Sequence, residues 1–265
     1  MRFGSETLLL IPCCAKKRAG GGPWDANLPA VADTFDSETY DILISARREL
    51  LLTIKELPAY SKGKYAKNMS IALGPDFGGD DGSGQYRPAL ERYTGSLYKA
   101  ETNWSAQVAK ALLNRTGPKL LIQSALYGLL HPWEPIQDYN LQTSDIPAKT
   151  IWSHKMPCLL KAFVERMNIQ RIIMYFGGST TYFRIAVQAV KPLLQSVKLK
   201  EVLHYNVERG NAYHTPHNHG LILLRDLTGK ETSGYTRPIN LRKIDVYDVY
   251  TIERYNGHQI INAHG

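Results

Sequence analysis

The feature that most constrains the fold is a series of short apolar runs separated by segments of helical periodicity. The runs have strand length, and apolar residues between them recur at helical spacing over residues 36–57, 150–167 and 180–194. Strands that alternate with helices predict an α/β fold, with a mixed, mainly parallel sheet and helices on both faces. The runs predicted as strands are residues 8–11, 120–122, 171–176, 201–205 and 221–224.

Length and composition favour one large domain. The chain has 265 residues, of which 43% are hydrophobic, and no repeat or linker divides it. We expect a single domain over residues 1–265. Residues 74–84 hold five glycines and three aspartates, which predicts a flexible loop. We expect the C-terminal part, residues 200–265, to diverge from the rest.

Cysteine usage and the N-terminal residues indicate a compartment. Cys13, Cys14 and Cys158 do not form a disulfide framework. The first residues include an acidic side chain and lack the apolar core of a signal peptide. No run approaches the ~20 apolar residues of a membrane span. We therefore expect a cytoplasmic protein with reduced thiols and no membrane partner.

The charge balance predicts a polyanionic partner. The formal net charge is +8, and nucleic acid is the usual partner that such a balance favours. Residues 60–68 interleave lysines with tyrosines, a pattern that can contact phosphates and stack on bases. The alternatives are a basic enzyme that binds no nucleic acid and, for residues 60–68, a solvated surface loop.

Polar loops follow three of the predicted strands. The first strand leads into Cys13 and the lysines Lys16 and Lys17, the second into residues 124–128, and the third into residues 177–181. If the three strands run parallel, their carboxyl ends place these loops at one edge of the sheet, where α/β proteins bind ligands. Ordinary connections between strand and helix are the alternative.

Two other classes of site lack support in the sequence. A Walker A motif is absent, and we expect no cofactor. His214, His217 and His219 have no Asp, Glu or Cys at ligand spacing, so we expect no metal there.

Several segments together resemble the YaaA family of peroxide-stress, DNA-binding proteins. The family has a Ser-Pro-Ala-Lys loop, a Tyr-Thr-Gly segment and a Ser-x-Leu/Lys-Tyr-Gly-Leu/Val-Leu element, which is followed by Pro and then by Gln-Pro-Tyr-x-Leu. The resemblance covers about residues 8–185 and implies a basic cleft, DNA binding and a fold related to DNA-repair proteins. The matching segments are residues 13–16, 93–95, 124–130, 136–141 and 171–183.

The chain departs from the family pattern at two places. Cys13-Cys14 stands where the family has Ser-Pro, and Asp138 replaces the proline before Tyr139. A carboxylate among amides and aromatic rings suits a pocket for an extruded base. Asp138 could orient water or stabilise an oxocarbenium-like sugar. The alternative is that Asp138 only caps a turn.

A lysine of the first loop has two candidate roles in the same chemistry. Lys16 or Lys17 could hold a phosphate that flanks the extruded nucleotide, or a lysine could attack C1′ as a Schiff-base nucleophile. We assign the catalytic roles to Asp138 and Lys16. The candidate substrate-binding residues are Cys13, Lys17, Tyr93, Thr94, Ser124, Tyr127, Gly128, Gln137, Tyr139, Asn140, Ser179 and Thr180.

Three functions remain open at this level. The first is a DNA glycosylase that flips out and excises a modified or damaged base, in repair or in defence against phage DNA. The second is a non-catalytic DNA-binding protein of the oxidative-stress response, with Cys13 and Cys14 as redox-sensitive thiols. The third is an enzyme directed at RNA or a nucleoside, such as a base-exchange transferase.

Overall fold

The computed structural model describes residues 3–114, 116–196, 199–207, 214–229, 241–243, 252–255 and 258–261. Its main sheet has the strand order β4-β3-β1-β6-β7-β8. The central strands β3, β1, β6 and β7 are parallel, and β4 and β8 are antiparallel at the two edges. The strands are β1 Thr7–Pro12, β3 Lys119–Ser124, β4 Gly128–Leu130, β6 Arg171–Met174, β7 Glu201–Val207 and β8 Leu241–Lys243. The predicted mixed, mainly parallel sheet is confirmed.

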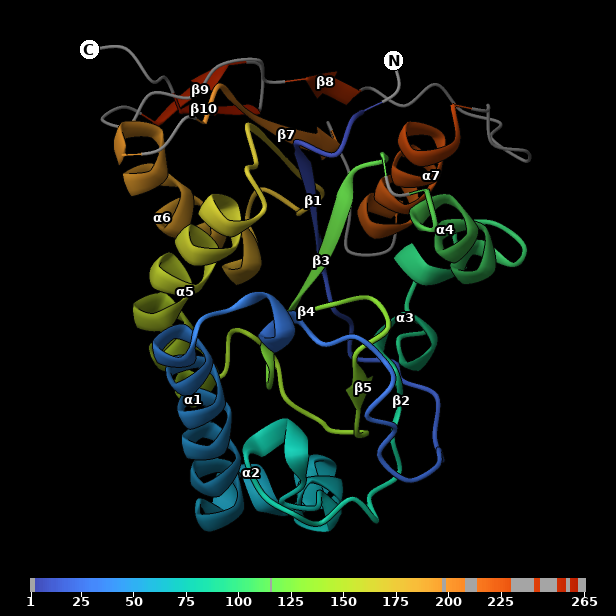
Figure 1. The fold of residues 1–265 in the computed structure, drawn as a ribbon, viewed down its shortest axis with the longest axis vertical. Helices are drawn as coiled ribbons and strands as arrows, with labels where there is room; N and C mark the ends of the chain where they lie inside the picture. Colours follow the sequence, from blue (N-terminus) through green and yellow to red (C-terminus); the bar gives the residue numbers. More distant parts are fainter. Residues whose placement is uncertain are drawn as a thin grey trace.

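Helices cover both faces of this sheet, as predicted. Helices α1, α5 and α6 lie on one side and α4 and α7 on the other (Figure 1). Strand β1 is buried from both faces, which explains why its sequence is a continuous apolar run instead of an alternating one. The helices are α1 Ser37–Glu56, α4 Trp104–Leu112, α5 Ile146–Arg166, α6 Thr181–Ser196 and α7 His214–Thr228.

Short elements complete the chain, and several of them lie beyond the carboxyl ends of β1 and β3. Figure 1 shows β2, β5 and α2 there, with β2 antiparallel to β5. A separate antiparallel pair joins β9 to β10. These elements are α2 Pro58–Ser61, α3 Ala89–Arg92, β2 Arg87–Pro88, β5 Pro135–Ile136, β9 Ile252–Tyr255, β10 His258–Ile261, and the 3-10 helices η1 Val31–Thr34, η2 Gly63–Ser70, η3 Pro75–Phe77 and η4 Leu97–Lys99.

The prediction of a strand at residues 221–224 is wrong. This run lies within the helix α7, and its four residues are buried. A short apolar run fits a buried helix and a buried strand equally well, so periodicity could not separate the two. Pro216 lies in the first turn of α7, where a proline is tolerated.

Residues 74–84 begin with an ordered turn. Helix η3 places Asp76 at 2% exposure and Phe77 at 0%, and Gly78 ends the turn with a φ of 69°. The Gly79 N–H donates to the carbonyl of Gly74 at 2.9 Å. The start of this glycine-rich segment is therefore packed into the protein, while the flexibility of its remainder stays a prediction.

No helix within the described residues has the length and apolar character needed to cross a bilayer.

Candidate functional site

The three predicted strand-end loops do meet. The backbone of Cys13, directly after β1, donates to the carbonyl of Gln123 on β3 at 2.8 Å. The hydroxyl of Tyr182, in the first turn of α6 after β6, lies 2.9 Å from Cys13 Sγ. Because β1 is parallel to both β3 and β6, their carboxyl ends gather these side chains at one edge of the sheet.

Buried hydroxyls line this edge. Ser124 Oγ lies 2.9 Å from the hydroxyl of Tyr139, which lies 3.0 Å from that of Tyr93. The Tyr139 hydroxyl also donates to Cys13 Sγ at 3.4 Å. Burial raises the pKa of Tyr93 and of Tyr139, so both phenols stay protonated at neutral pH. The group offers several neutral hydrogen-bond donors in a site shielded from water.

Lys17 extends into this group from the loop after β1. The backbone N–H of Thr94 donates to the Lys16 carbonyl at 2.9 Å, and that of Arg18 donates to the Arg92 carbonyl at 2.8 Å. These two bonds hold Lys17 opposite Tyr93 as an antiparallel bridge. The first loop is thereby fixed to the Tyr-Thr-Gly segment.

The Lys17 amine is buried and stands apart from hydrogen-bonding groups in the described part of the chain. Its Nζ lies 3.8 Å from the centroid of the Tyr139 ring and 5.8 Å from that of Tyr93. Although the residue as a whole keeps partial exposure, Nζ is buried and finds no hydrogen-bond partner among the described residues. Burial lowers the pKa of Lys17, because removal from water disfavours the charged ammonium. We call Cys13, Lys17, Tyr93, Ser124, Tyr139 and Tyr182 the strand-end cluster.

Cys14 borders the cluster as a protonated thiol. Its Sγ donates to the Lys16 carbonyl at 2.9 Å and accepts from the Gly95 N–H at 3.1 Å. Burial raises the pKa of Cys14 to about 11, so the reactive thiolate is scarce at neutral pH. A Cβ at Gly95 would lie 2.7 Å from Cys14 Cβ, which explains the glycine of the Tyr-Thr-Gly segment.

The two predicted catalytic residues lie at different places. Lys16 is exposed, so the amine that reaches the strand-end cluster is that of Lys17. Asp138 precedes Tyr139 and pairs with Lys67 of η2, with 3.0 Å between Lys67 Nζ and Asp138 Oδ2. Its side chain is 24% exposed. The carboxylate therefore lies at the border of the cluster and has a partner on the surface.

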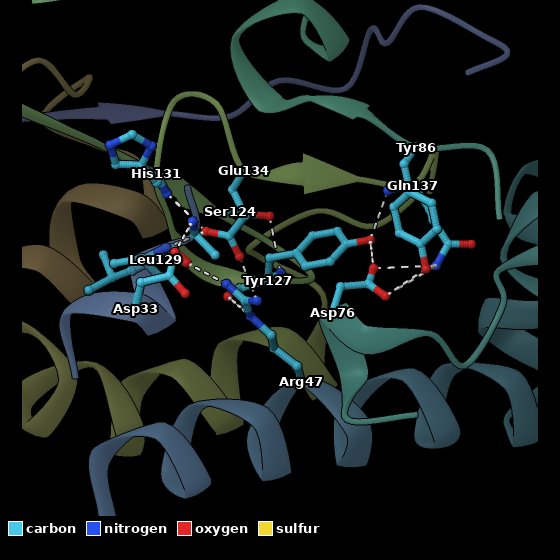
Figure 2. A network of polar contacts seen from close by, with 12 residues as sticks. Asp33, Arg47, Asp76, Tyr86, Ser124, Tyr127, Leu129, His131, Glu134 and Gln137 are labelled. Atoms are coloured by element: carbon cyan, nitrogen blue, oxygen red, sulfur yellow. Dashed lines mark hydrogen bonds and ion pairs between the residues drawn. The ribbon is translucent and has the colours of Figure 1, made fainter. Parts of the chain in front are cut away.

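Tyr127 and Gln137 belong to a second polar network, centred on Asp76 (Figure 2). The hydroxyls of Tyr86 and Tyr127 each donate to the Asp76 carboxylate at 2.9 Å, and Gln137 Nε2 donates to it at 3.3 Å. The Tyr127 hydroxyl accepts from the Gln137 N–H at 3.0 Å. Burial raises the pKa of Asp76 to about 6. We call these four residues the Asp76 network, and it fixes the segment that carries Asp138.

A buried ion pair supports the turn after β3 from below (Figure 2). Arg47 of α1 donates to the carbonyls of Tyr127 at 2.9 Å and Leu129 at 2.8 Å. Its Nη1 lies 2.7 Å from Glu134 Oε1, and both side chains are 1% exposed. The contact is an ion pair without the alignment of a hydrogen bond. Glu134 Oε2 in turn accepts from the Val31 N–H at 2.9 Å.

Other predicted substrate-binding residues have structural contacts. Gly128 has a φ of 72°, and a Cβ there would overlap the ring of Trp152. Asn140 donates its backbone N–H to Asn68 Oδ1 at 2.8 Å. Thr180 caps α6, since its Oγ1 accepts from the Phe183 N–H at 3.3 Å. Ser179 is exposed.

A cleft of about 690 Å³ lies on the other side of Tyr93, between α3, η4, α4 and α7. Tyr93, which is buried, and Thr94, which is partly exposed, contribute to its wall. Its lining also includes Arg18, Tyr98 and Trp133.

Sequence reasoning missed Tyr182 and Asp76 as contributors, and it included Lys67 only as part of the basic stretch 60–68. Tyr182 could have been found, because it lies in the segment after the third predicted strand, from which Ser179 and Thr180 were selected. Lys67 and Asp76 reach the site through contacts of long sequence separation, which no local pattern shows.

Metal ligation finds no support within the described ranges, where no group of three His, Cys, Asp or Glu side chains is placed to hold an ion. His219 is buried in α7, with its Nε2 2.8 Å from the carbonyl of Tyr205.

The fold and the site define an α/β protein with a buried amine, thiols and hydroxyls at its parallel strand ends. The sequence matches the family model of the peroxide stress protein YaaA over residues 14–202, well over half of the 265 residues, and the chain belongs to this family. The matched range includes Lys17, Tyr93, Ser124 and Tyr139. The family resemblance and its link to peroxide stress are thus confirmed. No curated protein matches the chain.

Proposed function

We propose that this protein is a DNA enzyme that excises a modified or damaged base by cleaving its N-glycosidic bond, with Lys17 as the nucleophile. The observation that carries the proposal is the buried Lys17 Nζ, which has a lowered pKa and no hydrogen-bond partner among the described residues. Enzymes obtain a nucleophilic lysine in this way, by desolvating the amine so that a neutral fraction exists near pH 7. The net charge of +8 supports a polyanionic substrate.

The reaction can be written with its protons balanced. Neutral Nζ attacks C1′, and the bond from C1′ to the base breaks with its electron pair on the base. The proton that Nζ loses goes to the departing base. Protonation of O4′ by a proton from solvent then opens the sugar ring and leaves a protonated Schiff base on Lys17. Water hydrolyses this Schiff base to an aldehyde and the free amine and returns one proton to solvent. An extruded base is required, since the C1′ atom is otherwise shielded by stacking.

The neighbouring groups suit this chemistry. The protonated hydroxyls of Tyr93 and Tyr139, with Ser124, can donate hydrogen bonds to the sugar or the departing base. Asp138 can stabilise the positive charge that develops on the sugar. These roles replace the initial assignment of Lys16 as the catalytic lysine, because the Lys16 side chain is exposed.

Borohydride trapping tests the proposal, since it reduces a Schiff base to a stable amine and crosslinks enzyme to DNA. We expect wild type to be trapped on one of a panel of oxidised, alkylated or phage-type modified DNA substrates. Lys17→Ala and Lys17→Arg should lose the crosslink and base release by about 100-fold or more, because the nucleophile is absent. Lys16→Ala is the matched control and should keep both.

Trapping of Lys17→Ala at the wild-type level would contradict the assignment of the nucleophile. Lys17→Arg keeps the charge beside the tyrosine rings, so its loss of activity cannot be attributed to misfolding caused by a missing cation. Faster release from RNA or a free nucleoside than from DNA would contradict the substrate class.

The alternative is a non-catalytic DNA-binding protein of the peroxide response, which the family assignment favours. It predicts salt-dependent DNA binding without base release or crosslinking, unchanged by Lys17→Ala. A role for Cys14 as a peroxide sensor is disfavoured by its raised pKa, because the thiolate is the oxidised species.

A further inference from the structure

An exposed ion pair borders the strand-end cluster. Lys67 Nζ lies 3.0 Å from Asp138 Oδ2 and 3.2 Å from Oδ1, and the side chains are 44% and 24% exposed. Pairs with this exposure contribute little to stability, because water and salt compete for both partners. Either member can therefore exchange its partner for another charged group at little cost.

The pair stands next to the buried amine. Asp138 is followed by Tyr139, whose ring lies 3.8 Å from Lys17 Nζ. The charges of both Asp138 and Lys67 act on Lys17, the carboxylate raising its pKa and the ammonium lowering it, within the larger decrease that burial causes. A change of partner at Lys67 would thus change the electrostatic surroundings of the Lys17 amine.

Helix η2, which carries Lys67, is firmly anchored to the segment that carries Asp138. Asn68 Nδ2 donates to the carbonyls of Tyr60 at 3.0 Å and Asn140 at 2.9 Å, and Asn68 Oδ1 accepts from the Asn140 N–H. The Tyr65 hydroxyl donates to the Asp145 carboxylate at 3.0 Å. These contacts fix the backbone of η2 next to the segment that carries Asp138.

The outer side of η2 presents cations. Lys62, just before η2, and Lys64 and Lys67 within it are exposed, while Tyr65 and Asn68 are buried. Closely spaced lysines on a fixed backbone are complementary to the regularly spaced phosphates of a nucleic-acid strand. The sugar-phosphate backbone of DNA is the occupant that this charge pattern and the proposed substrate favour.

We propose that Lys67 is a phosphate-binding positioning residue, and that a backbone phosphate of the DNA substrate replaces Asp138 as its partner and releases Asp138 toward Lys17. This inference rests on the proposed function. In the free protein Lys67 neutralises Asp138. In the complex the released carboxylate faces the sugar and the Lys17 nitrogen, where the reaction develops positive charge, so DNA binding prepares the site for chemistry.

A double-mutant cycle in DNA binding tests this exchange, with fluorescence anisotropy of a labelled DNA duplex measured over a range of salt concentrations. Lys67→Ala should weaken binding and reduce the magnitude of the log–log salt slope by about 0.9, the value for one phosphate contact. Asp138→Asn should tighten binding several-fold, because Lys67 no longer has a competing partner. In the Lys67→Ala background, Asp138→Asn should have no effect.

The chain offers a matched control pair. Lys161 and Glu165 on α5 form another exposed ion pair at 3.9 Å, away from the strand-end cluster. Lys161→Ala and Glu165→Gln change the net charge by the same amounts as the test variants. We expect both controls to keep the wild-type salt slope and their effects to be additive.

Three outcomes would overturn the exchange. The first is that Asp138→Asn still tightens DNA binding in the Lys67→Ala background. The second is that Lys67→Ala and Lys161→Ala have the same salt slope. The third is that an RNA of the same sequence binds more tightly than the DNA and shows the same coupling between Lys67 and Asp138. Binding is measured without chemistry, so the two proposals can fail separately. If the enzyme is crosslinked to DNA but the effects of Lys67→Ala and Asp138→Asn on binding are additive, only the exchange is refuted. If the two effects are coupled but no crosslink forms, only the proposed reaction is refuted.

Discussion

Lys16 and Lys17 are neighbours in the sequence and lie in different surroundings. The Lys16 side chain is exposed, and its carbonyl accepts from Thr94 and from Cys14. Lys17, one position further along the bridge to Tyr93, points inward over the ring of Tyr139. Side chains alternate between the two faces of an extended segment, so one residue of register decides which lysine is buried.

Asp76 is a buried carboxylate with three donors around it. Burial still raises its pKa to about 6, since the cost of removing the charge from water exceeds what the hydrogen bonds return. The unfolded chain ionises at about 4 instead. Between these values the folded protein holds a proton that the unfolded chain has released.

The free energy of unfolding should therefore fall as pH rises from about 4 to about 6, by at most about 1.4 kcal/mol per pH unit from Asp76. Below this window both states are protonated and above it both are ionised, so the contribution of Asp76 has no slope there. Urea unfolding at several pH values should show a steeper fall in wild type than in Asp76→Asn.

Asp80→Asn is the control for the pH measurement, because Asp80 is exposed in the same segment. It should keep the wild-type slope between pH 4 and 6. A slope that is equal in wild type and Asp76→Asn would show that Asp76 is ionised throughout this window in the folded protein.

Among the elements, α6 brings Tyr182 to the strand-end cluster, and its start is defined by one side chain. Thr180 Oγ1 accepts from the Phe183 N–H at 3.3 Å and donates to the Gly177 carbonyl at 2.7 Å. Thr180 is therefore the residue that caps α6. The first turn of α6 then holds the Tyr182 hydroxyl against Cys13.

Thr180→Ala should lower the free energy of unfolding by about 1 kcal/mol, the usual cost of removing a cap. Ser179→Ala, one residue earlier and exposed, should be close to neutral. Chemical denaturation of the two variants compares them directly. Equal losses would mean that the hydrogen bond of Thr180 does not stabilise the helix.

For the whole molecule, the Arg47–Glu134 pair connects regions far apart in the sequence. Arg47 on α1 binds the backbone of the turn around β4, and Glu134 binds the start of η1. Both side chains are buried, so each compensates the charge of the other. The pair thereby joins α1 and the edge of the sheet to the segment that leads to the Asp76 network.

Arg47→Met should lower the free energy of unfolding by about 3–5 kcal/mol, because it leaves the Glu134 charge buried without its partner. The double variant Arg47→Met/Glu134→Gln should recover at least about 1 kcal/mol, since the glutamine keeps an acceptor and removes the charge. Urea denaturation of wild type, both single variants and the double variant completes the cycle. Additive losses would contradict a direct interaction.

The sequence alone determined the layered architecture, because buried parallel strands and amphipathic helices leave different apolar periods. It located the three strand ends that meet, and it identified the family through the segments around Cys13, Tyr93 and Ser124. It failed at residues 221–224, where a short apolar run carries no period, and it placed Arg47 outside the apolar face of its helix.

Only the tertiary structure decided the composition of the site. Which lysine is buried depends on the bridge between Lys17 and Tyr93, and the partner of Asp138 is Lys67, 71 positions away in the chain. Tyr127 and Gln137 bind Asp76 instead of joining the strand-end cluster. Asp76 lies in the glycine-rich segment 74–84, which the sequence predicted to be a flexible loop. Burial and charge pairing arise from contacts between distant segments, and these contacts give Lys17 the surroundings that distinguish it from the other lysines of the chain.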